Sequence, residues 1–430
     1  MLHSASRKVR SGLLDNSIRI GANVFENVIC RKIASSSRKQ TVMPAWVIDR
    51  YGNNSMLRFT KNSLFPMIRY PNEVLIKVYA SSLNPIDISM RNGYGAAALK
   101  LKRDPLHINA PGSEFPLILG RDVSGVIMET GLDVSFFKPG DEVWAAVPPW
   151  KPGTLAEFVV ASANEVSHKP KALSHRQAAA LPYVALTAWS ALVNNGGLRK
   201  DNCKGKRVLI LGGSGGIGTF AIQLLKAWGA HVTTTCSENA FSFLKDLGVD
   251  HVINYKAQSM EKQLKDLEMF DFILDNVGGH TEDWALNLLK PWSGATYVTL
   301  VTPFMVNTDR LGITNGIAQS GITLGSKILK HLRKGIHYRW AIFAPSGPTL
   351  DEVTELVNEG KPTAILLAIN ILELTIDQKL NWSSHINAVA TRAGQRLGIL
   401  QRVTHLLSPH CLSTVYKTQV RSVMEYSPLA

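Results

Sequence analysis

The sequence predicts an α/β protein in which a β-rich, mostly antiparallel domain precedes a doubly wound parallel sheet. From residue 41 to about 185, short β-rich runs alternate with Gly/Pro turns, in 73–85, 119–131, 137–149 and 153–166. From 206 to 330, apolar strands alternate with amphipathic helices, the pattern of repeated βαβ units around buried parallel strands. A helical stretch at 176–197 marks the change of domain.

Length and composition exclude several classes of protein. The 430 residues suffice for two domains, and 45% apolar with 19% charged residues is typical of a globular chain. No apolar run reaches the roughly 18 residues that a membrane span needs, so we expect no membrane-spanning helix. The four cysteines form no Cys-x-x-Cys pair, which argues against a disulfide scaffold or thiolate zinc site.

The net charge of +14 is concentrated at the front of the chain. Residues 1–40 hold eight basic residues against Asp15 and Glu26, and they are rich in serine. This composition predicts a mitochondrial targeting segment over 1–40, with a disordered basic arm as the alternative. Because the remaining charge is spread thinly, we expect no nucleic-acid partner.

A glycine-rich turn separates the first apolar strand of the βαβ region from a helix at 216–229. In Gly213-x-Gly215-x-x-Gly218, the first glycine permits the turn, the second lets a pyrophosphate approach, and the third lets helix and strand pack closely. A purely structural turn is the alternative. Contacts to the phosphate are predicted from Ser214 and from Gly216, Ile217 and Gly218 at the helix N-terminus.

The end of the second strand decides between NAD and NADP. Glu238 lies 20 residues after Gly218, which favours NAD because an acid there binds the ribose 2′-hydroxyl. However, Ser237 is predicted to end the strand and Glu238 to begin the next helix, which leaves room for a 2′-phosphate. Tyr255 and Lys256, just past the third strand, could reach that phosphate. The sequence therefore favours NADPH.

Six segments occur in the order found in medium-chain dehydrogenases/reductases of the quinone oxidoreductase branch, which residues 41–361 resemble: ASSLNPIDISMRNGY, LGRDVSGVI, FKPGDEVWA, GTLAEFVV, LPYVALTAWSAL and the glycine-rich turn. The resemblance implies a GroES-like catalytic domain over 41–185, a Rossmann NADPH-binding domain over 186–330, and a return to the catalytic domain over 331–361. It implies NADPH as hydride donor and a quinone or activated enone as acceptor. It also implies a protein partner of reticulon type and allows a homodimer.

Zinc is not expected. Alcohol dehydrogenases of this kind need an early cysteine followed by a His-Glu pair, whereas the corresponding region here reads Asn84-Pro85-Ile86-Asp87 and His107 stands alone. Tyr94, Asn84 and Asp87 lie where the branch lines its cleft, and Tyr94 could donate a proton or hydrogen bond. The alternatives are structural: a turn at Asn84, a cap at Asp87, packing for Tyr94, and solvent as the proton source.

Further cofactor contacts are expected at the carboxyl edge of the parallel sheet, where ligands bind in such folds. Asn276 follows the fourth strand, and Leu300 and Val301 end the fifth. By resemblance, these residues touch the nicotinamide half of the cofactor. Ala341 and Phe343 lie in 337–343, which is predicted to return to the catalytic domain, and they could reach the cofactor from there.

Residues 362–430 depart from the resemblance. From about residue 373 the tail is similar to a fragment of a non-LTR retrotransposon reverse transcriptase, without the paired carboxylates of its polymerase site. A transposon insertion or an incorrectly joined gene is favoured over an appended domain. Loss of the closing strands would leave a sheet edge unpaired, so impaired activity is expected.

Two functions remain open from the sequence. The first is a zinc-independent, NADPH-dependent reductase of quinone type in the mitochondrion, in the matrix or associated with the inner membrane. The second is a non-catalytic NADPH-binding scaffold. Both need the same cofactor residues, so turnover with quinones has to separate them.

Overall fold

The computed structural model describes residues 41–103 and 114–359. The predicted targeting segment at 1–40, His107 and the tail at 362–430 lie outside the described residues. Within 41–103 and 114–359, every helix is too short or too polar to cross a bilayer.

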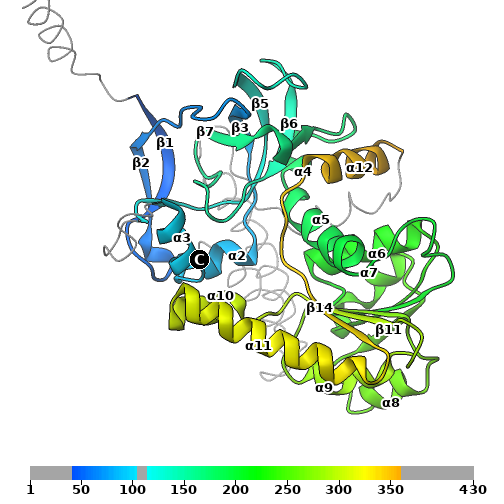
Figure 1. Cartoon of the computed structure of the whole chain (residues 1–430). Coiled ribbons are helices and arrows are strands. Elements are labelled where there is room, and N and C mark those ends of the chain that lie inside the picture. Colours follow the sequence, from blue (N-terminus) through cyan, green and yellow to red (C-terminus); the bar gives the residue numbers. More distant parts are fainter. Residues whose placement is uncertain (1–40, 104–113, 360–430) are drawn as a thin grey trace, which may run out of the picture. The chain divides into compact units, whose positions relative to one another are not determined.

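The first half of the described chain is built on a five-stranded antiparallel sheet in the order β7-β3-β5-β6-β8 (Figure 1). Apolar residues such as Val74, Ile76 and Ile127 are fully buried on one face and form the core of this half. A second sheet has the order β2-β1-β4. The strands are β1 (Val42–Ile48), β2 (Leu57–Leu64), β3 (Glu73–Ala80), β4 (Leu117–Ile118), β5 (Asp122–Thr130), β6 (Glu142–Ala146), β7 (Phe158–Ser162) and β8 (Val166–His168).

Two helices of this half lie where the sequence places candidate catalytic residues. Helix α2 (Pro85–Arg91) begins at a proline, which suits the first helical position because its missing N–H would have no partner there. Helix α3 (Ala96–Arg103) follows two glycines with positive φ, Gly93 and Gly95. Short 3-10 turns are η1 (Asn54–Met56) and η2 (Ala163–Glu165).

The second half contains a six-stranded sheet, all parallel, in the order β11-β10-β9-β12-β13-β14. Counted within this sheet, the order is 3-2-1-4-5-6, so the direction of winding reverses between β9 and β12. This confirms the predicted doubly wound sheet. Its strands are β9 (Arg207–Leu211), β10 (His231–Cys236), β11 (His251–Asn254), β12 (Phe272–Asp275), β13 (Thr296–Thr299) and β14 (His337–Trp340).

Helices connect these strands. As predicted, α6 ends just before Gly229, whose φ of +78° suits glycine. The helices are α6 (Gly216–Ala227), α7 (Phe241–Asp246), α8 (Met260–Lys265), α9 (Thr281–Ala285), α10 (Phe304–Leu311) and α11 (Ile313–Leu332), with 3-10 turns η4 (Glu238–Ala240) and η5 (Leu286–Leu288).

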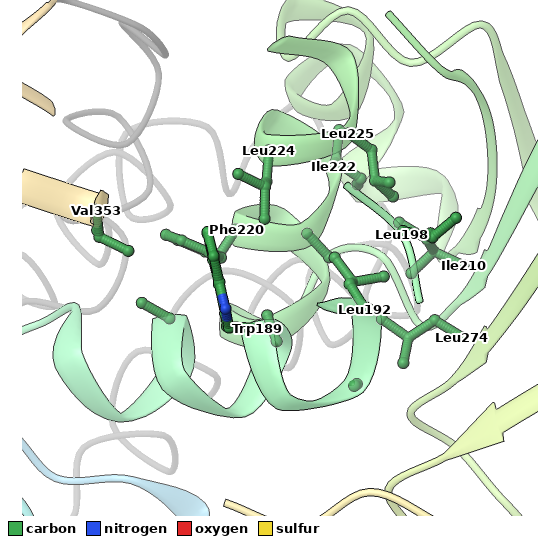
Figure 2. Close-up of a cluster of buried hydrophobic side chains, with 14 of the residues drawn as sticks. Trp189, Leu192, Leu198, Ile210, Phe220, Ile222, Leu224, Leu225, Leu274 and Val353 are labelled. Carbon is green, nitrogen blue, oxygen red and sulfur yellow. The ribbon is translucent and has the colours of Figure 1, made fainter. Parts of the chain in front are cut away.

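One apolar core is shared by both halves. Four helices contribute buried side chains to this core: α4 (His175–Ala178), α5 (Pro182–Trp189), the π-helical η3 (Ser190–Asn195) and α12 (Gly347–Asn358). Figure 2 shows Phe220 of α6 between Val353 of α12 and Leu192 of η3, with Trp189 below Phe220 and Leu192 on the side of Ile210 and Leu274. Each such buried side chain contributes roughly 1.5–3 kcal/mol relative to exposure, so this core holds the halves together.

The structure corrects the expected end of the parallel sheet. The segment 337–343 was expected to return to the catalytic domain, but His337–Trp340 pairs with β13 as the sixth strand. The sheet therefore continues past residue 330. The chain crosses back only after Ala341, and α12 packs against β8, η2 and α5.

Candidate functional site

The glycine-rich turn joins β9 to α6 at the point where the sheet reverses its winding. Gly212, not Gly213, takes the left-handed conformation, with φ +77°. Gly213 is needed for a different reason: a Cβ there would overlap the Thr234 hydroxyl of β10. The sequence analysis missed Gly212 because a one-residue shift in a run of glycines leaves no signal in the pattern.

The remaining glycines have the predicted surroundings. A Cβ on Gly218 would lie 2.6 Å from the Gly212 carbonyl oxygen, so helix and turn need glycine to pack. Ser214 and Gly215 are exposed, and a Cβ on Gly215 would meet only the Gly212 oxygen at 3.9 Å. Gly215 precedes α6, and no side chain of the described residues caps the first N–H groups of this helix, which are those of Gly216, Ile217 and Gly218. This is an arrangement that binds phosphate.

The ends of β10 and β11 lie side by side, because Tyr255 N–H donates to the Cys236 carbonyl at 3.1 Å. β10 ends at Cys236, one residue before the predicted end at Ser237, and Glu238 begins η4 as the sequence predicts. Tyr255 is 53% exposed, and the Lys256 ammonium lies 5.8 Å from its ring centre. The Tyr255 phenol and the Lys256 ammonium therefore lie at this edge of the sheet.

Asn276 follows β12, and both polar atoms of its side chain are buried with no hydrogen-bond partner among the residues that the structure describes. A buried amide in this state costs free energy unless a ligand completes it. Its turn is held by Asp275, whose carboxylate accepts bonds from Tyr297 O–H at 2.7 Å, Gly278 N–H at 2.9 Å and Val277 N–H at 3.0 Å. Asp275 was missed, although a carboxylate ending an apolar strand is a visible signal.

Leu300 and Val301 begin the loop after β13 on the same edge, and Leu300 N–H donates to the Asp275 carbonyl at 3.1 Å. Ala341 is buried beyond β14, and its N–H donates to the Thr299 carbonyl at 3.0 Å. Phe343 stacks on Tyr183 of α5, with ring centres 4.4 Å apart and 13° between planes. Leu300 and Val301 thus follow β13, the neighbour of the strand that precedes Asn276, and Ala341 and Phe343 follow β14.

Asn84 and Asp87 are both buried and already engaged. Asp87 accepts from Asn84 N–H and from Gly120 N–H, each at 2.8 Å, and lies 3.7 Å from the Arg121 guanidinium. Burial raises the pKa of Asp87, against the opposing effect of Arg121. Its bonds match the structural alternative, a cap of α2, and leave its carboxylate committed to the fold.

Asp122, a residue the sequence analysis did not single out, connects the candidate catalytic segment to α5. Its carboxylate accepts from Ser82 O–H, from the Asn84 side-chain amide and from Tyr183 N–H, each at 2.6 Å. Burial raises the pKa of Asp122 to about 7 against these three donors, and nearby Asp87 adds to the effect. Tyr183, also missed, is itself half-buried, and burial with the charges of Asp87 and Asp122 raises its pKa.

Tyr94 is half-buried at the turn before α3. Burial raises its pKa first, and the charge of Asp309 adds to it, so the phenol holds its proton more tightly than a free tyrosine does. Asp309 belongs to α10 of the other half and accepts from Gly95 N–H and Ala97 N–H at 2.7 and 3.0 Å. The structure therefore brings Tyr94 next to an element from the cofactor half.

No group of three or more His, Cys, Asp or Glu side chains in 41–103 and 114–359 is arranged to hold a metal ion. Cys203 and Cys236 are buried, and burial raises the pKa of each thiol to about 11, which disfavours the thiolate that zinc needs.

Comparisons with known proteins agree with this architecture. The alcohol dehydrogenase GroES-like domain model matches residues 70–171, and the zinc-binding dehydrogenase model matches residues 216–335. The quinone oxidoreductase structure from Coxiella burnetii is similar, with a TM-score of 0.60 and 32% identity over 77% of this chain and 96% of that chain.

Two curated relatives are much more similar in sequence. "NAD(P)H oxidoreductase RTN4IP1, mitochondrial" of Danio rerio is 68% identical over 331 residues, 77% of this chain and 86% of the relative. The Homo sapiens protein of the same name is 66% identical over 340 residues, 79% of this chain and 86% of the relative. Their names agree with the mitochondrial location predicted from the sequence. By these similarities the chain belongs to the RTN4IP1 family of mitochondrial NAD(P)H oxidoreductases, which have the GroES-like and Rossmann domains of medium-chain dehydrogenases/reductases.

Proposed function

We propose that this chain is a zinc-independent reductase of quinone type that uses NADPH and transfers a hydride to a quinone or activated enone in mitochondria. The observation that carries the proposal is the glycine-rich turn before α6, placed at the reversal point of the parallel sheet. Ligands in doubly wound folds bind at that point.

The residues around the turn fit a dinucleotide. The open N–H groups of Gly216, Ile217 and Gly218 would hold the pyrophosphate. The Asn276 amide, buried and unpartnered, would complete its hydrogen bonds on the nicotinamide side. When bound, NADPH supplies the hydride, which is chemistry that no side chain provides.

The chain's own residues would orient the acceptor and supply hydrogen bonds. Tyr94, whose phenol is protonated at neutral pH, can donate to an acceptor oxygen on which negative charge develops. Asp122 fixes the Asn84 amide and the start of α5, while the stacked rings of Tyr183 and Phe343 give an apolar wall between the halves. In this proposal, Asp87 contributes by holding α2 in place rather than by touching the acceptor.

Two features support zinc independence. A metal ion needs side chains whose lone pairs are free to bind it. Arg121 has no such lone pair, and its guanidinium donates to the Pro148 and Lys151 carbonyls at 2.8 and 3.2 Å. The Asp122 carboxylate, next in sequence, accepts three hydrogen bonds. The proposal is tested by activity after dialysis against a chelator, which should stay unchanged.

Ser237, Tyr255 and Lys256 support NADPH over NADH, because an uncharged strand end and a nearby cation suit a 2′-phosphate. Lys256→Ala should weaken NADPH binding roughly tenfold and leave NADH binding unchanged, since one exposed charge-assisted contact to phosphate is removed. Equal losses for the two cofactors would contradict the assignment. Lys262→Ala, a lysine on α8, is the matched control.

Steady-state oxidation of NADPH against a panel of quinones and enones separates a reductase from a scaffold. Turnover with at least one acceptor supports the reductase, and Tyr94→Phe should then lower kcat with NADPH affinity intact. Tight NADPH binding without oxidation by any acceptor would instead support a scaffold. The relative in Caenorhabditis elegans is named "Reticulon-4-interacting protein 1, mitochondrial", and a reticulon-type partner for this chain is part of the proposal.

A further inference from the structure

Helix α11 packs against the protein with one of its faces. Its inner face packs on α10 and β14: a Cβ on Gly316 would lie 2.5 Å from the Thr308 backbone, and His331 stacks on Tyr338 at 5.7 Å. Asn307 donates to Ser320 across the contact with α10 at 3.0 Å. The inner face of α11 is therefore covered by α10 and β14.

The outer face of α11 carries a stripe of apolar residues, of which all but Gly325 are exposed. Ala318, Ile322, Gly325, Leu329 and Leu332 recur at spacings of three and four, so they share one side of the helix. Ile322 is 73% exposed, Leu329 66% and Leu332 49%. A Cβ on Gly325 or on neighbouring Gly321 would meet no atom within 4 Å among the residues that the structure describes. A surface helix normally turns polar residues outward.

Basic residues border the stripe. Lys330, Arg333 and Lys334 are exposed at the C-terminal end of α11, and no ion pair is found for them in the part of the chain that the structure describes. The sequence holds no Asp or Glu from Arg310 to Leu350, a run that includes the whole of α11. An exposed apolar stripe beside unbalanced positive charge is typical of helices that lie on anionic lipid surfaces.

We propose that the outer face of α11 docks onto an anionic lipid bilayer, with the helix lying in the plane of the headgroups. A helix of 20 residues presents a line of about 30 Å, which suits a flat surface. An anionic surface would neutralise the exposed cations Lys330 and Arg333 at the end of the helix. The stripe residues would enter the region below the headgroups while the lysines and arginines contact lipid phosphates.

Cosedimentation of the full chain with vesicles tests this directly. We expect binding to phosphatidylcholine vesicles that contain phosphatidylglycerol, little binding to phosphatidylcholine alone, and loss of binding at high salt. The double variant Lys330→Glu/Arg333→Glu should weaken binding at least roughly 20-fold, from about fivefold for each basic side chain lost. Ile322→Gln/Leu329→Gln should abolish binding. Leu132→Gln, a residue 97% exposed on a turn of the other half, is the matched control and should bind as the unchanged chain does.

Two outcomes would overturn the proposal. One is equal binding to both kinds of vesicle or equal binding by all variants. The other is absence of lipid binding together with a dimer that Ile322→Gln/Leu329→Gln dissociates, which would make the stripe an interface between copies. NADPH binding by each variant checks that it is folded, and a failure of NADPH turnover would leave the lipid result unaffected.

Discussion

Asp309 accepts a 2.7 Å hydrogen bond from the backbone N–H of Gly95, although 214 residues separate the two in the chain. The same carboxylate accepts from Ala97 N–H at 3.0 Å, so an acid on α10 caps the first turn of α3. Tyr94 lies directly before this cap. One side chain thus ties the cofactor half to the segment that carries the candidate proton donor.

Asp309→Ala should cost about 1 kcal/mol of unfolding free energy, the usual value of a lost helix cap. Because Tyr94 loses its fixed neighbour, kcat should fall several-fold while the Kd for NADPH stays constant. Chemical denaturation and steady-state kinetics measure the two effects. Asp283→Ala, an exposed acid on α9, is the control. A changed Kd with unchanged kcat would contradict the placing of Asp309 on the acceptor side.

Asp122 should make stability and activity depend on pH in opposite directions. Its pKa in the folded protein, about 7, is above the ordinary value, so the folded state holds this proton more tightly than the unfolded state. The contribution to stability is fully present below about pH 4 and is lost as pH rises towards 7, at about 1.4 kcal/mol for each unit. Only the ionised carboxylate accepts from all three donors, so kcat/KM should fall below about pH 7.

The Asp122→Asn variant isolates this titration. The difference in unfolding free energy between the unchanged chain and the variant should change across pH 4 to 7, favouring the unchanged chain at the acidic end. The acidic fall in kcat/KM should be absent from the variant's own profile. Parallel curves for the two proteins would show that Asp122 does not titrate in this range.

A methyl group at Gly218 should prevent cofactor binding. In the Gly218→Ala variant the new Cβ would meet the Gly212 carbonyl oxygen at 2.6 Å and the Gly213 Cα at 2.7 Å, so the turn must shift. Calorimetry should show at least a hundredfold weaker NADPH binding. Gly321→Ala makes the same change in an open helical position and should bind NADPH normally while gaining roughly 0.5–1 kcal/mol of stability.

Asn276→Ala should stabilise the free protein and weaken its complex. The substitution removes two buried polar atoms that lack partners, a relief of about 1–3 kcal/mol in the absence of ligand. The same atoms are those proposed to bind the cofactor, so NADPH affinity should fall. Thermal unfolding with and without NADPH measures both signs. A loss of stability in the free protein would mean that the amide serves the fold.

Much of the architecture could be predicted because periodicity records which face of an element is buried. The apolar strands and the helix from Gly216 were recognisable by their alternation, and Gly229 as the end of that helix by its residue type. The segment 337–343 was misjudged because a short strand at a sheet edge, His337–Trp340, has no clear period. Only its pairing with β13 shows where it belongs.

The site was predictable where contacts are local in sequence and hidden where they are not. The turn residues and Ser237 follow from their position after a strand. The hydrogen bonds that Asp122 accepts from Ser82, Asn84 and Tyr183 span 38 to 61 residues of sequence. Those that Asp309 accepts from Gly95 and Ala97 span more than 200. No pattern within a window of sequence contains such partners.

Within residues 41–103 and 114–359 the chain passes between its two halves twice, once through α5 and η3 and once after Ala341. The Ser190 hydroxyl donates to the Ile342 carbonyl at 2.7 Å, which fastens one passage to the other. Two adjacent crossings that are bonded to each other act as a single hinge. An opening of the halves would therefore be a rotation about this line, and it would have to break the contact of Asp309 with the start of α3.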